Sequence, residues 1–588
     1  MVHGVGFLIA MMLAATTAAA PSWLTRAERT GFIETSRYEE TLADCRRLEK
    51  DSPLIHVTSF GTSPEGRDLI LVIASKDRAF TPAAAAKTGK PIVLIQAGIH
   101  AGEIDGKDAG LMLLRDITTG PRLAGLLDHA IILFMPIYNV DGHERFGPYN
   151  RINQTGPKEQ GWRTTSRNLN LNRDYVKADA VETRAWLKVF TSWWPDLTID
   201  CHVTDGTDYQ YDLTYGFESG PNVAPSVAWW IEATVNDHVV PALTAGGHMP
   251  SPYIFLKDDL DPAAGLQSFG PSPPRFSTGY TVLQNRPSFL VETHMLKDYR
   301  TRVLVTYDTL VAFLEEVNRD PDALRDAVRA ADALAARPGS LPLKYSQTGT
   351  KRQVPYKGVE YRREPSEVSG AMRVTYGKRP LEMMMEMTEG IALDVVIEKP
   401  SAYIVPPQWR EAIEVLKAHG LKLSRLTTAV TGAFDGYRLT EPVWKSEPFE
   451  GRHQVAFKTE RLKGQTRTFP AGSIVVPMDQ RSSTVASHLL EPQAPDSFVS
   501  WGFFDAIFEQ KEFAEAYVLE TLAREMMQKD PELKAEFEKA LSDPNFASSP
   551  TKRLDFFYRR SPWWDDRIGL YPVGIVPSPR VLPVEPLP

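Results

Sequence analysis

Cysteine is scarce in this chain, because Cys45 and Cys201 are the only two among 588 residues. So small a supply excludes a disulfide-stapled scaffold, and a chain of this length can bury a core that needs no disulfide. Cys45 shares a helical stripe with apolar residues, and Cys201 lies inside an apolar run. Both patterns are typical of buried small side chains. We therefore expect two free thiols.

The sequence also lacks a long basic block and any internal apolar run long enough to cross a bilayer. Its 66 Lys and Arg against 74 Asp and Glu give a formal net charge of -8. Such a charge pattern offers no electrostatic footprint for a phosphate backbone, so nucleic acid is not an expected partner. The mixed composition indicates a globular protein, and the length exceeds what one hydrophobic core usually supports. Two or more domains are expected.

The first twenty residues differ in kind from the rest. Residues 4–20 are continuously apolar or small and end before Pro21, as a secretory signal peptide does. No Lys or Arg precedes the stretch, and a retained membrane anchor is the alternative interpretation. We expect a signal peptide at 1–20, export to the periplasm or the extracellular space, and no stable membrane insertion after cleavage.

Apolar runs alternate with helical patterns in the first half of the chain. A helix is predicted from Ser36 to about Lys50, and a short hairpin follows within 56–75. Four further runs are apolar at nearly every position: Ile92–Ala97, Ala130–Pro136, Leu197–Cys201 and Ser288–Val291. Such runs suit strands that helices cover on both faces, so an α/β fold is predicted.

The stretch Ala335–Leu343 contains Pro and Gly after a predicted helix and is the expected domain boundary. The region beyond it is expected to be β-rich at first and then helical from Phe513 to Leu541, a second mixed β/α region. Met383, Met384, Met385 and Met387 favour a strand packed in a core over a cofactor site. The predicted parts are a first domain at 21–335, a linker at 336–345, an accessory region at 346–575 and a Pro-rich tail at 576–588.

A candidate metal site begins where the first of the apolar runs ends. His100 lies in the turn after Ile92–Ala97, and Glu103 begins the next helix. A histidine and a glutamate three residues apart in a turn that leads into a helix can face one point, and Gly98 and Gly102 permit the tight bend. The spacing alone is a weak signal, since His488 and Glu491 share it without a strand end or a glycine turn. The position at a strand's carboxyl end favours the first pair.

A third ligand should come from another strand end, because zinc hydrolases use three protein ligands and keep one position open for water. His202 follows the apolar run Leu197–Cys201 and precedes a turn, which makes it the best candidate. A lone histidine is commonly structural. His129 enters a strand instead of leaving one, and His143 lies in a turn, so both are weaker rivals.

Five short motifs then follow in order: His100–Glu103, Asn139–Gly142, Asn168–Arg173, His202 and Phe289–Glu292. In this order they resemble the zinc carboxypeptidase family, the carboxypeptidase A-like metallopeptidases, over about residues 37–302. The resemblance implies a mixed eight-stranded central sheet between helices, with 21–335 as the catalytic domain. It also implies a zinc cofactor held by His100, Glu103 and His202, and hydrolysis of the C-terminal peptide bond of peptides.

The resemblance assigns further roles. Glu292 would accept the proton of the attacking water and pass it to the leaving amine. Arg163, nine residues before Asn172, has the spacing of the arginine that stabilises the oxyanion, with Arg151 and Arg167 as alternatives. Asn172 and Arg173 resemble the pair that receives the terminal carboxylate of the substrate, for which a planar guanidinium is suited.

Two positions depart from the family pattern. Many relatives carry Asp two residues before the Asn-Arg pair, where it orients the first zinc histidine, whereas this chain has Asn170. A neutral amide raises the basicity of His100 less than a carboxylate would, so weaker metal binding is expected. The substrate-capping tyrosine of the family is hard to place. Tyr280 is the best candidate, with a core aromatic as the alternative.

Peptides are the expected partners of this site, because a long second region and an export signal accompany it. An alternative on the same scaffold is a deacylase or amidase that acts on small N-acyl amino acids or cell-wall peptides. An alternative of another class is a catalytically silent peptide-binding protein.

Overall fold

The computed structural model describes residues 23–587, which form two compact units. The first unit holds the residues up to Asp332 together with Gln347–Ile391, and the second holds Ala333–Ser346 and the residues from Ala392 onward. The signal peptide predicted at 1–20 lies outside the described residues. Across 23–587, no helix is both long and apolar enough to cross a membrane.

An eight-stranded mixed sheet forms the centre of the first unit, in the order β1-β2-β4-β3-β5-β10-β6-β7. Its inner strands β4, β3, β5 and β10 are mutually parallel, and antiparallel pairs join β2 to β4 and β6 to β10. The predicted α/β fold with a mixed central sheet is confirmed. The strands are β1 (Ile55–Thr62), β2 (Asp68–Ala74), β3 (Ile92–Ala97), β4 (Ile131–Met135), β5 (Leu197–Val203), β6 (Leu213–Gly216), β7 (Pro250–Pro252) and β10 (Ser288–Thr293).

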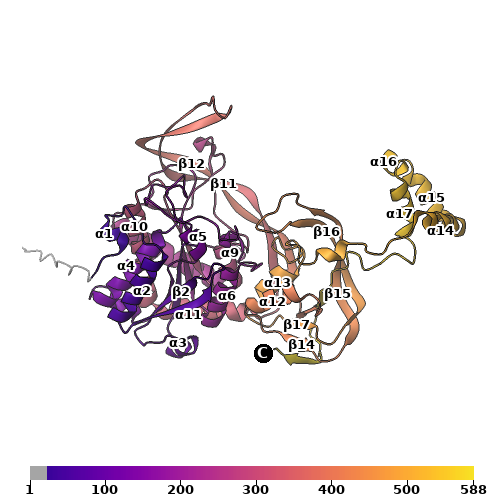
Figure 1. Ribbon diagram of the computed structural model, residues 1–588, viewed down its shortest axis with the longest axis horizontal. Helices are drawn as coiled ribbons and strands as arrows, with labels where there is room; N and C mark the ends of the chain where they lie inside the picture. The colour runs from indigo at the N-terminus through magenta and orange to yellow at the C-terminus, as the bar shows by residue number, and fades with distance from the viewer. Residues whose placement is uncertain (1–22, 588) are drawn as a thin grey trace, which may run out of the picture. The chain divides into compact units, whose positions relative to one another are not determined.

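Helices cover both faces of this sheet (Figure 1). On one face lie α2 (Tyr38–Asp51), α4 (Asp105–Thr119) and α10 (Tyr299–Arg319), and on the other α6 (Val181–Trp193) and α9 (Ser277–Leu283). Every residue of β3, β4, β5 and β10 is buried, as the continuous apolar runs predicted.

Two glycines set α4 close against the sheet. A Cβ on Gly106 would lie 2.4 Å from Cys201 Cβ, and one on Gly110 would lie 2.3 Å from the Phe134 ring. Real side chains do not approach so closely, so only glycine permits this packing. Glu103 lies two residues before α4 begins, and the close packing therefore holds this glutamate at the sheet's carboxyl edge.

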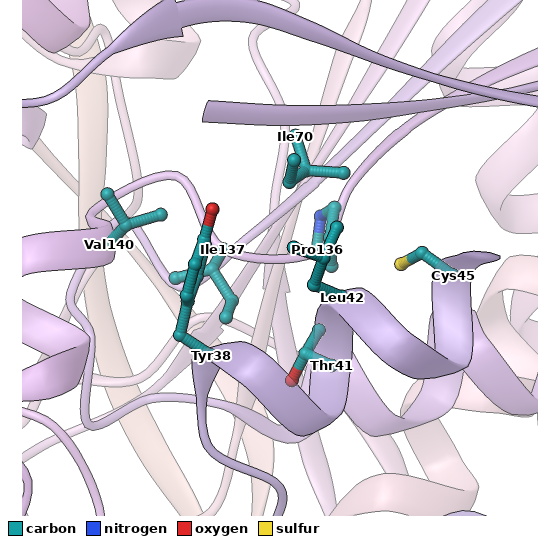
Figure 2. Close-up of a pocket in the computed structure, with 8 residues that line it drawn as sticks. All are labelled: Tyr38, Thr41, Leu42, Cys45, Ile70, Pro136, Ile137 and Val140. Carbon is teal, nitrogen blue, oxygen red and sulfur yellow. The ribbon is translucent and has the colours of Figure 1, made fainter. Parts of the chain in front are cut away.

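Both cysteines are free and buried, as the sequence predicted. Cys45 borders a cavity of about 10 Å³ between α2 and the sheet, among apolar side chains (Figure 2). A cavity of that volume holds one water molecule at most, so it is no ligand site. Its lining residues are Tyr38, Thr41, Leu42, Cys45, Ile70, Pro136, Ile137 and Val140.

The expected domain boundary differs from the structure in one respect. Helix α11 (Pro321–Ala335) ends one residue before the predicted end at Ala336, and β11 (Ser340–Pro365) begins inside the expected linker 336–345. With β12 (Met372–Glu398), β11 forms a long hairpin, and its residues 347–391 belong to the catalytic unit instead of the accessory region. The physical reason is a small apolar core that this hairpin shares with the catalytic unit: Tyr209, Tyr211, Leu266, Val354, Tyr356, Met385 and Met387.

The methionine-rich stretch packs as a core strand. Met385 and Met387 are buried in this core and Met383 is partly buried against it, whereas Met384 is 58% exposed. Alternation of buried and exposed positions is the pattern of a strand with one buried face. The interpretation as a core strand is confirmed.

The second unit is built on a seven-stranded sheet in the order β16-β15-β18-β13-β17-β14-β19. As the sequence predicted, it is β-rich first and helical later. Its strands are β13 (Ala402–Val405), β14 (Ser424–Leu426), β15 (Val430–Trp444), β16 (Val455–Phe469), β17 (Ile474–Pro477), β18 (Gly574–Val576) and β19 (Val584–Pro586). Its main helices are α12 (Arg410–Ala418), α13 (Ser483–Leu490), α14 (Ala516–Lys529), α15 (Pro531–Ala540) and α17 (Pro550–Tyr558).

Candidate metal centre and catalytic site

His100, Glu103 and His202 meet at the carboxyl ends of β3 and β5. Gly98, with φ at +65°, turns the chain after β3 so that His100 and then Glu103 come back over the strand ends. Nδ1 of His100 lies 3.1 Å from Glu103 Oε2, and Nδ1 of His202 lies 3.0 Å from the same oxygen. Ligand atoms of all three buried side chains lie within 4.8 Å of one another.

The Nε2 atom of each histidine, which points away from Glu103, is hydrogen-bonded to an acceptor oxygen. Nε2 of His100 donates to Asn170 Oδ1 at 3.0 Å, and Nε2 of His202 donates to Asp200 Oδ2 at 2.9 Å. Asp200 Oδ2 also accepts from Ser277 Oγ at 2.5 Å. In a neutral imidazole that carries its proton on Nε2, the Nδ1 atom has a free lone pair. Two such lone pairs facing one carboxylate oxygen are the donor set of a divalent cation with N and O ligands.

The pKa shifts of the two histidines in this cluster have opposite directions. Burial lowers the pKa of His100 to about 4, and it would also lower that of His202. Asp200 and Glu103 outweigh burial at His202 and hold its pKa well above the usual range. Burial would raise the pKa of Glu103, but the charges of His100 and Arg151 hold it well below its ordinary value. Glu103 is thus an anion in a buried place.

Two arginines reach the second oxygen of Glu103. Nη1 of Arg151 lies 3.0 Å from Glu103 Oε1, and Nη1 of Arg163 lies 3.1 Å from it. The Arg151 side chain is 8% exposed and that of Arg163 is 35% exposed. Of the two, Arg163 is therefore better placed to meet a substrate. Arg167, the other alternative, is exposed.

Glu292 lies beside His202 because β10 and β5 pair in parallel with these two residues in register. The glutamate is 8% exposed. Burial raises its pKa to about 8, and the neighbouring carboxylates Glu103 and Asp200 add to that effect against the charge of His202. A cation bound at the ligand cluster would oppose this shift.

Asn172 and Arg173 lie on a short 3₁₀ turn, η2 (Leu171–Arg173), next to Asn170. Asn172 Oδ1 accepts from the Ser277 backbone N–H at 2.9 Å, and the Arg173 guanidinium carbon lies 4.0 Å from the centre of the Phe276 ring. The loop that orients His100 through Asn170 therefore also positions the predicted carboxylate-binding pair.

Tyr280 was predicted to cap the substrate, and the structure shows otherwise. Its side chain has no exposed surface and packs against Tyr175 and Trp186, with ring centroids 5.6 and 5.9 Å away. Gln284 Nε2 donates to its hydroxyl at 2.8 Å. Every residue of α9 is buried, and Tyr280 is a core aromatic, which was the alternative interpretation.

Tyr253 is a tyrosine near the metal-ligand cluster that the sequence analysis did not identify. Its hydroxyl lies 3.1 Å from Thr204 Oγ1, two residues past His202. Burial raises the pKa of its hydroxyl well above the usual value, and the charges of Glu292 and Glu103 raise that pKa further. It stands between β7 and β8 (Phe255–Leu256) in a loop that no motif marks.

The rival histidines do not join the cluster. His129 is exposed, and His143 is buried beside Lys107 and Glu144. His488 lies in α13 of the second unit. Glu491, which follows His488 by three residues, accepts hydrogen bonds from the hydroxyls of Tyr403 and Tyr437. Within residues 23–587, the one such group of possible ligands is the cluster already described.

A mixed α/β sheet that delivers two histidines and a glutamate to its carboxyl edge provides a candidate metal site. Residues 41–228 match the model of the zinc carboxypeptidase family. The chain is 22% identical over 515 residues to carboxypeptidase 2 of Trichophyton tonsurans, covering 82% of this chain and 87% of that protein. Residues 41–228 thus resemble a zinc carboxypeptidase domain, and the relatives that match most of the chain are carboxypeptidases.

Shorter and more distant similarities were also found. Carboxypeptidase A6 of Mus musculus is 30% identical over 128 residues, which are 21% of this chain and 27% of that protein. Among solved structures, a metallo-carboxypeptidase from Burkholderia cenocepacia matches at 18% identity and a TM-score of 0.36, over 48% of this chain and 69% of that one. Carboxypeptidase A from Helicoverpa armigera matches at 16% identity and a TM-score of 0.36, over 50% and 74%.

Proposed function

We propose that this protein removes C-terminal residues from peptides, with zinc held by His100, Glu103 and His202 and with Glu292 as general base. The observation that carries the proposal is the convergence of the two Nδ1 atoms on Glu103 Oε2, with each Nε2 bonded outward. Three ligands of N and O type leave a fourth position for water, which is the donor set of a catalytic zinc site.

When bound, zinc supplies Lewis acidity and lowers the pKa of water towards neutrality. Glu292 then takes the proton of the attacking water and delivers it to the leaving amine, a transfer that its buried position beside His202 supports. Arg163, partly exposed at the edge of the site, would stabilise the negative oxygen that forms on the scissile carbonyl.

Specificity for the chain end would come from Asn172 and Arg173. The backbone N–H of Ser277 holds the Asn172 side chain, and the guanidinium of Arg173 stacks on Phe276. A guanidinium fixed in this way can give a carboxylate two parallel hydrogen bonds. Tyr253 replaces Tyr280 as the candidate that covers the bound substrate, because its hydroxyl lies 3.1 Å from Thr204, two residues past the proposed ligand His202.

We also propose that the enzyme acts after export, on peptides outside the cytoplasm. The apolar stretch at residues 4–20 supports this part of the proposal. Sequencing the N-terminus of the mature protein tests it, with a start shortly after residue 20 as the expected result and a retained Met1 as the opposing one.

The test of the main proposal joins metal analysis to a C-terminal ladder assay on a mixed peptide library. We expect about one zinc per chain and successive loss of C-terminal residues. Faster hydrolysis of an acetylated amino acid than of a blocked dipeptide would favour the deacylase instead. Zinc-loaded protein that binds peptides and cleaves none would identify a silent binding protein.

A further inference from the structure

The hairpin of β11 and β12 rises from the body of the catalytic unit as a long two-stranded arm (Figure 1). We call it the arm, residues 347–391. It lies outside the residues that match the family model. The arm belongs to a four-stranded sheet in the order β11-β12-β9-β8. Near the base of the arm, β9 (Leu266–Gln267) pairs with β12 at Met387 and Thr388.

The arm is bonded to the loop that leaves the metal centre. This loop, 204–212, starts two residues after the ligand His202. Gln210 Nε2 donates to the Gly358 carbonyl at 2.8 Å, and the Lys357 N–H donates to the Tyr211 hydroxyl at 2.9 Å. Farther out along the arm, the hydroxyls of Thr207 and Tyr376 are 2.7 Å apart. The arm therefore borders the loop over much of its length.

The same loop faces the catalytic groups. The ring of Tyr209 stacks on His294, two residues past Glu292, at 4.1 Å between centroids. Asp205 Oδ1 lies 3.7 Å from Nη2 of Arg151, whose Nη1 lies 3.0 Å from the proposed ligand Glu103. Thr204 meets Tyr253, as described above. Residues on the loop thus join the arm on one side and the catalytic site on the other.

The direction of the substrate decides what the arm can meet. The two substituents of a peptide bond extend in opposite directions, so a chain whose terminal carboxylate reaches Asn172 and Arg173 must leave the site away from them. Those two residues are held by Ser277 and Phe276, whereas loop 204–212 is held by Tyr253, His294 and the arm. The loop is thus a separate part of the site, and a peptide whose upstream part left over it would meet the arm.

We propose that the arm is a wall of the substrate cleft and that Tyr376 contacts peptide residues upstream of the scissile bond. The inference rests on the proposed function and adds a substrate class, peptides of several residues as opposed to dipeptides. An aromatic ring with a hydroxyl can stack on a peptide chain and hydrogen-bond to it at low entropic cost. Removing it should matter more as the substrate becomes longer.

The experiment compares a benzoyl-blocked dipeptide with a hexapeptide that ends in the same two residues, using the full-length zinc-loaded enzyme. We expect Tyr376→Ala to lower the ratio of kcat/KM for the hexapeptide to that for the dipeptide about tenfold, mainly through KM. The matched control is Arg373→Ala on the same strand, whose side chain pairs with Glu364 instead of facing Thr207. Its ratio should equal that of the wild type.

Folding and metal content are checked on each variant by its unfolding midpoint and its zinc content. An equal loss on both substrates would overturn the inference, because it would mean that the arm only braces the loop. An unchanged ratio in Tyr376→Ala would overturn it as well. If the wild-type enzyme cleaves neither substrate, the proposed function itself fails, which is a separate result.

Discussion

Single side chains carry the chemistry proposed for this site, and Glu292 is the one whose removal separates binding from turnover. Glu292→Gln keeps the size of the side chain and removes its basicity. We expect zinc content to stay at about one per chain and kcat to fall by about 10²- to 10⁴-fold, the usual contribution of a general base. Metal analysis and steady-state kinetics on a blocked dipeptide measure both quantities.

The control for this substitution is Glu316→Gln on α10, where the carboxylate pairs with Arg319. It should keep both zinc and activity. A Glu292→Gln enzyme that turned over at the wild-type rate would remove Glu292 from the mechanism, and one that lost its zinc would give it a structural role at the ligands.

The residue that accepts the hydrogen bond of His100 Nε2 is expected to affect the affinity for zinc. Asn170 Oδ1 accepts from His100 Nε2, and an Asp at this position would accept the same bond with a full negative charge. Asn170→Asp should therefore raise the basicity of Nδ1 and tighten zinc binding about 10-fold or more, the usual range for such outer partners. Competition with a chelator measures the affinity. Asp200→Asn, the opposite change at His202, should weaken binding, and an effect of the same sign from both variants would contradict this account.

Asp44 gives the stability of the protein a pH dependence. Burial in α2 raises its pKa to about 6, above the value of about 3.9 expected in the unfolded chain. Between these values the native state binds the proton more tightly, so this residue's contribution to stability declines as pH rises from about 4 to 6 and stays low above. Asp44→Asn should stabilise the protein at pH 7 by on the order of 1 kcal/mol, after solvent screening, and have little effect near pH 4.

Urea unfolding at the two pH values measures this difference. Asp51→Asn, at the exposed end of the same helix, is the control and should shift stability by less. A gain for Asp44→Asn that was larger at pH 4 than at pH 7 would contradict the assignment.

At the scale of elements, the close packing of α4 against the sheet places Glu103. Gly110→Ala would put a methyl group 2.3 Å from the Phe134 ring, and the helix or the ring must then move. We expect a loss of about 1 to 3 kcal/mol, the usual cost of overpacking. Gly125→Ala is the control, since only one atom lies within 4 Å of its Cβ, at 3.9 Å. The urea midpoint measures both, and Phe134→Leu should restore part of the loss if the clash is the cause.

The elements that sequence could predict are those whose signal is local. The strands β3, β4, β5 and β10 are apolar at nearly every position, and their ends carry His100, His202 and Glu292. The arm was assigned to the wrong part of the chain, because its partner residues Tyr209 and Tyr211 lie more than 140 positions earlier. No periodicity within β11 or β12 reports such a partner.

The same limit explains the tyrosines. Tyr280 was the best candidate for the substrate-capping tyrosine, but the whole of α9 is buried in the core. Tyr253 carries no motif, and only the fold brings it to Thr204. Position at a strand end therefore predicted which side chains cluster, whereas residues presented by loops depended on packing that the sequence does not display.

At the scale of the molecule, the two units have separate cores, so zinc should stabilise one of them alone. A ligand that binds only the folded state adds RT ln(1 + [L]/Kd), about 4 kcal/mol when free zinc is a thousand times Kd. We therefore expect two calorimetric transitions, of which a chelator lowers one by several degrees and leaves the other in place. The ligand variant His202→Ala should show the lowered transition already, with no further response to the chelator. Equal movement of both transitions, or a response retained in His202→Ala, would mean that the stabilising metal binds somewhere other than the cluster at the strand ends, and the assignment of His100, Glu103 and His202 would then fail.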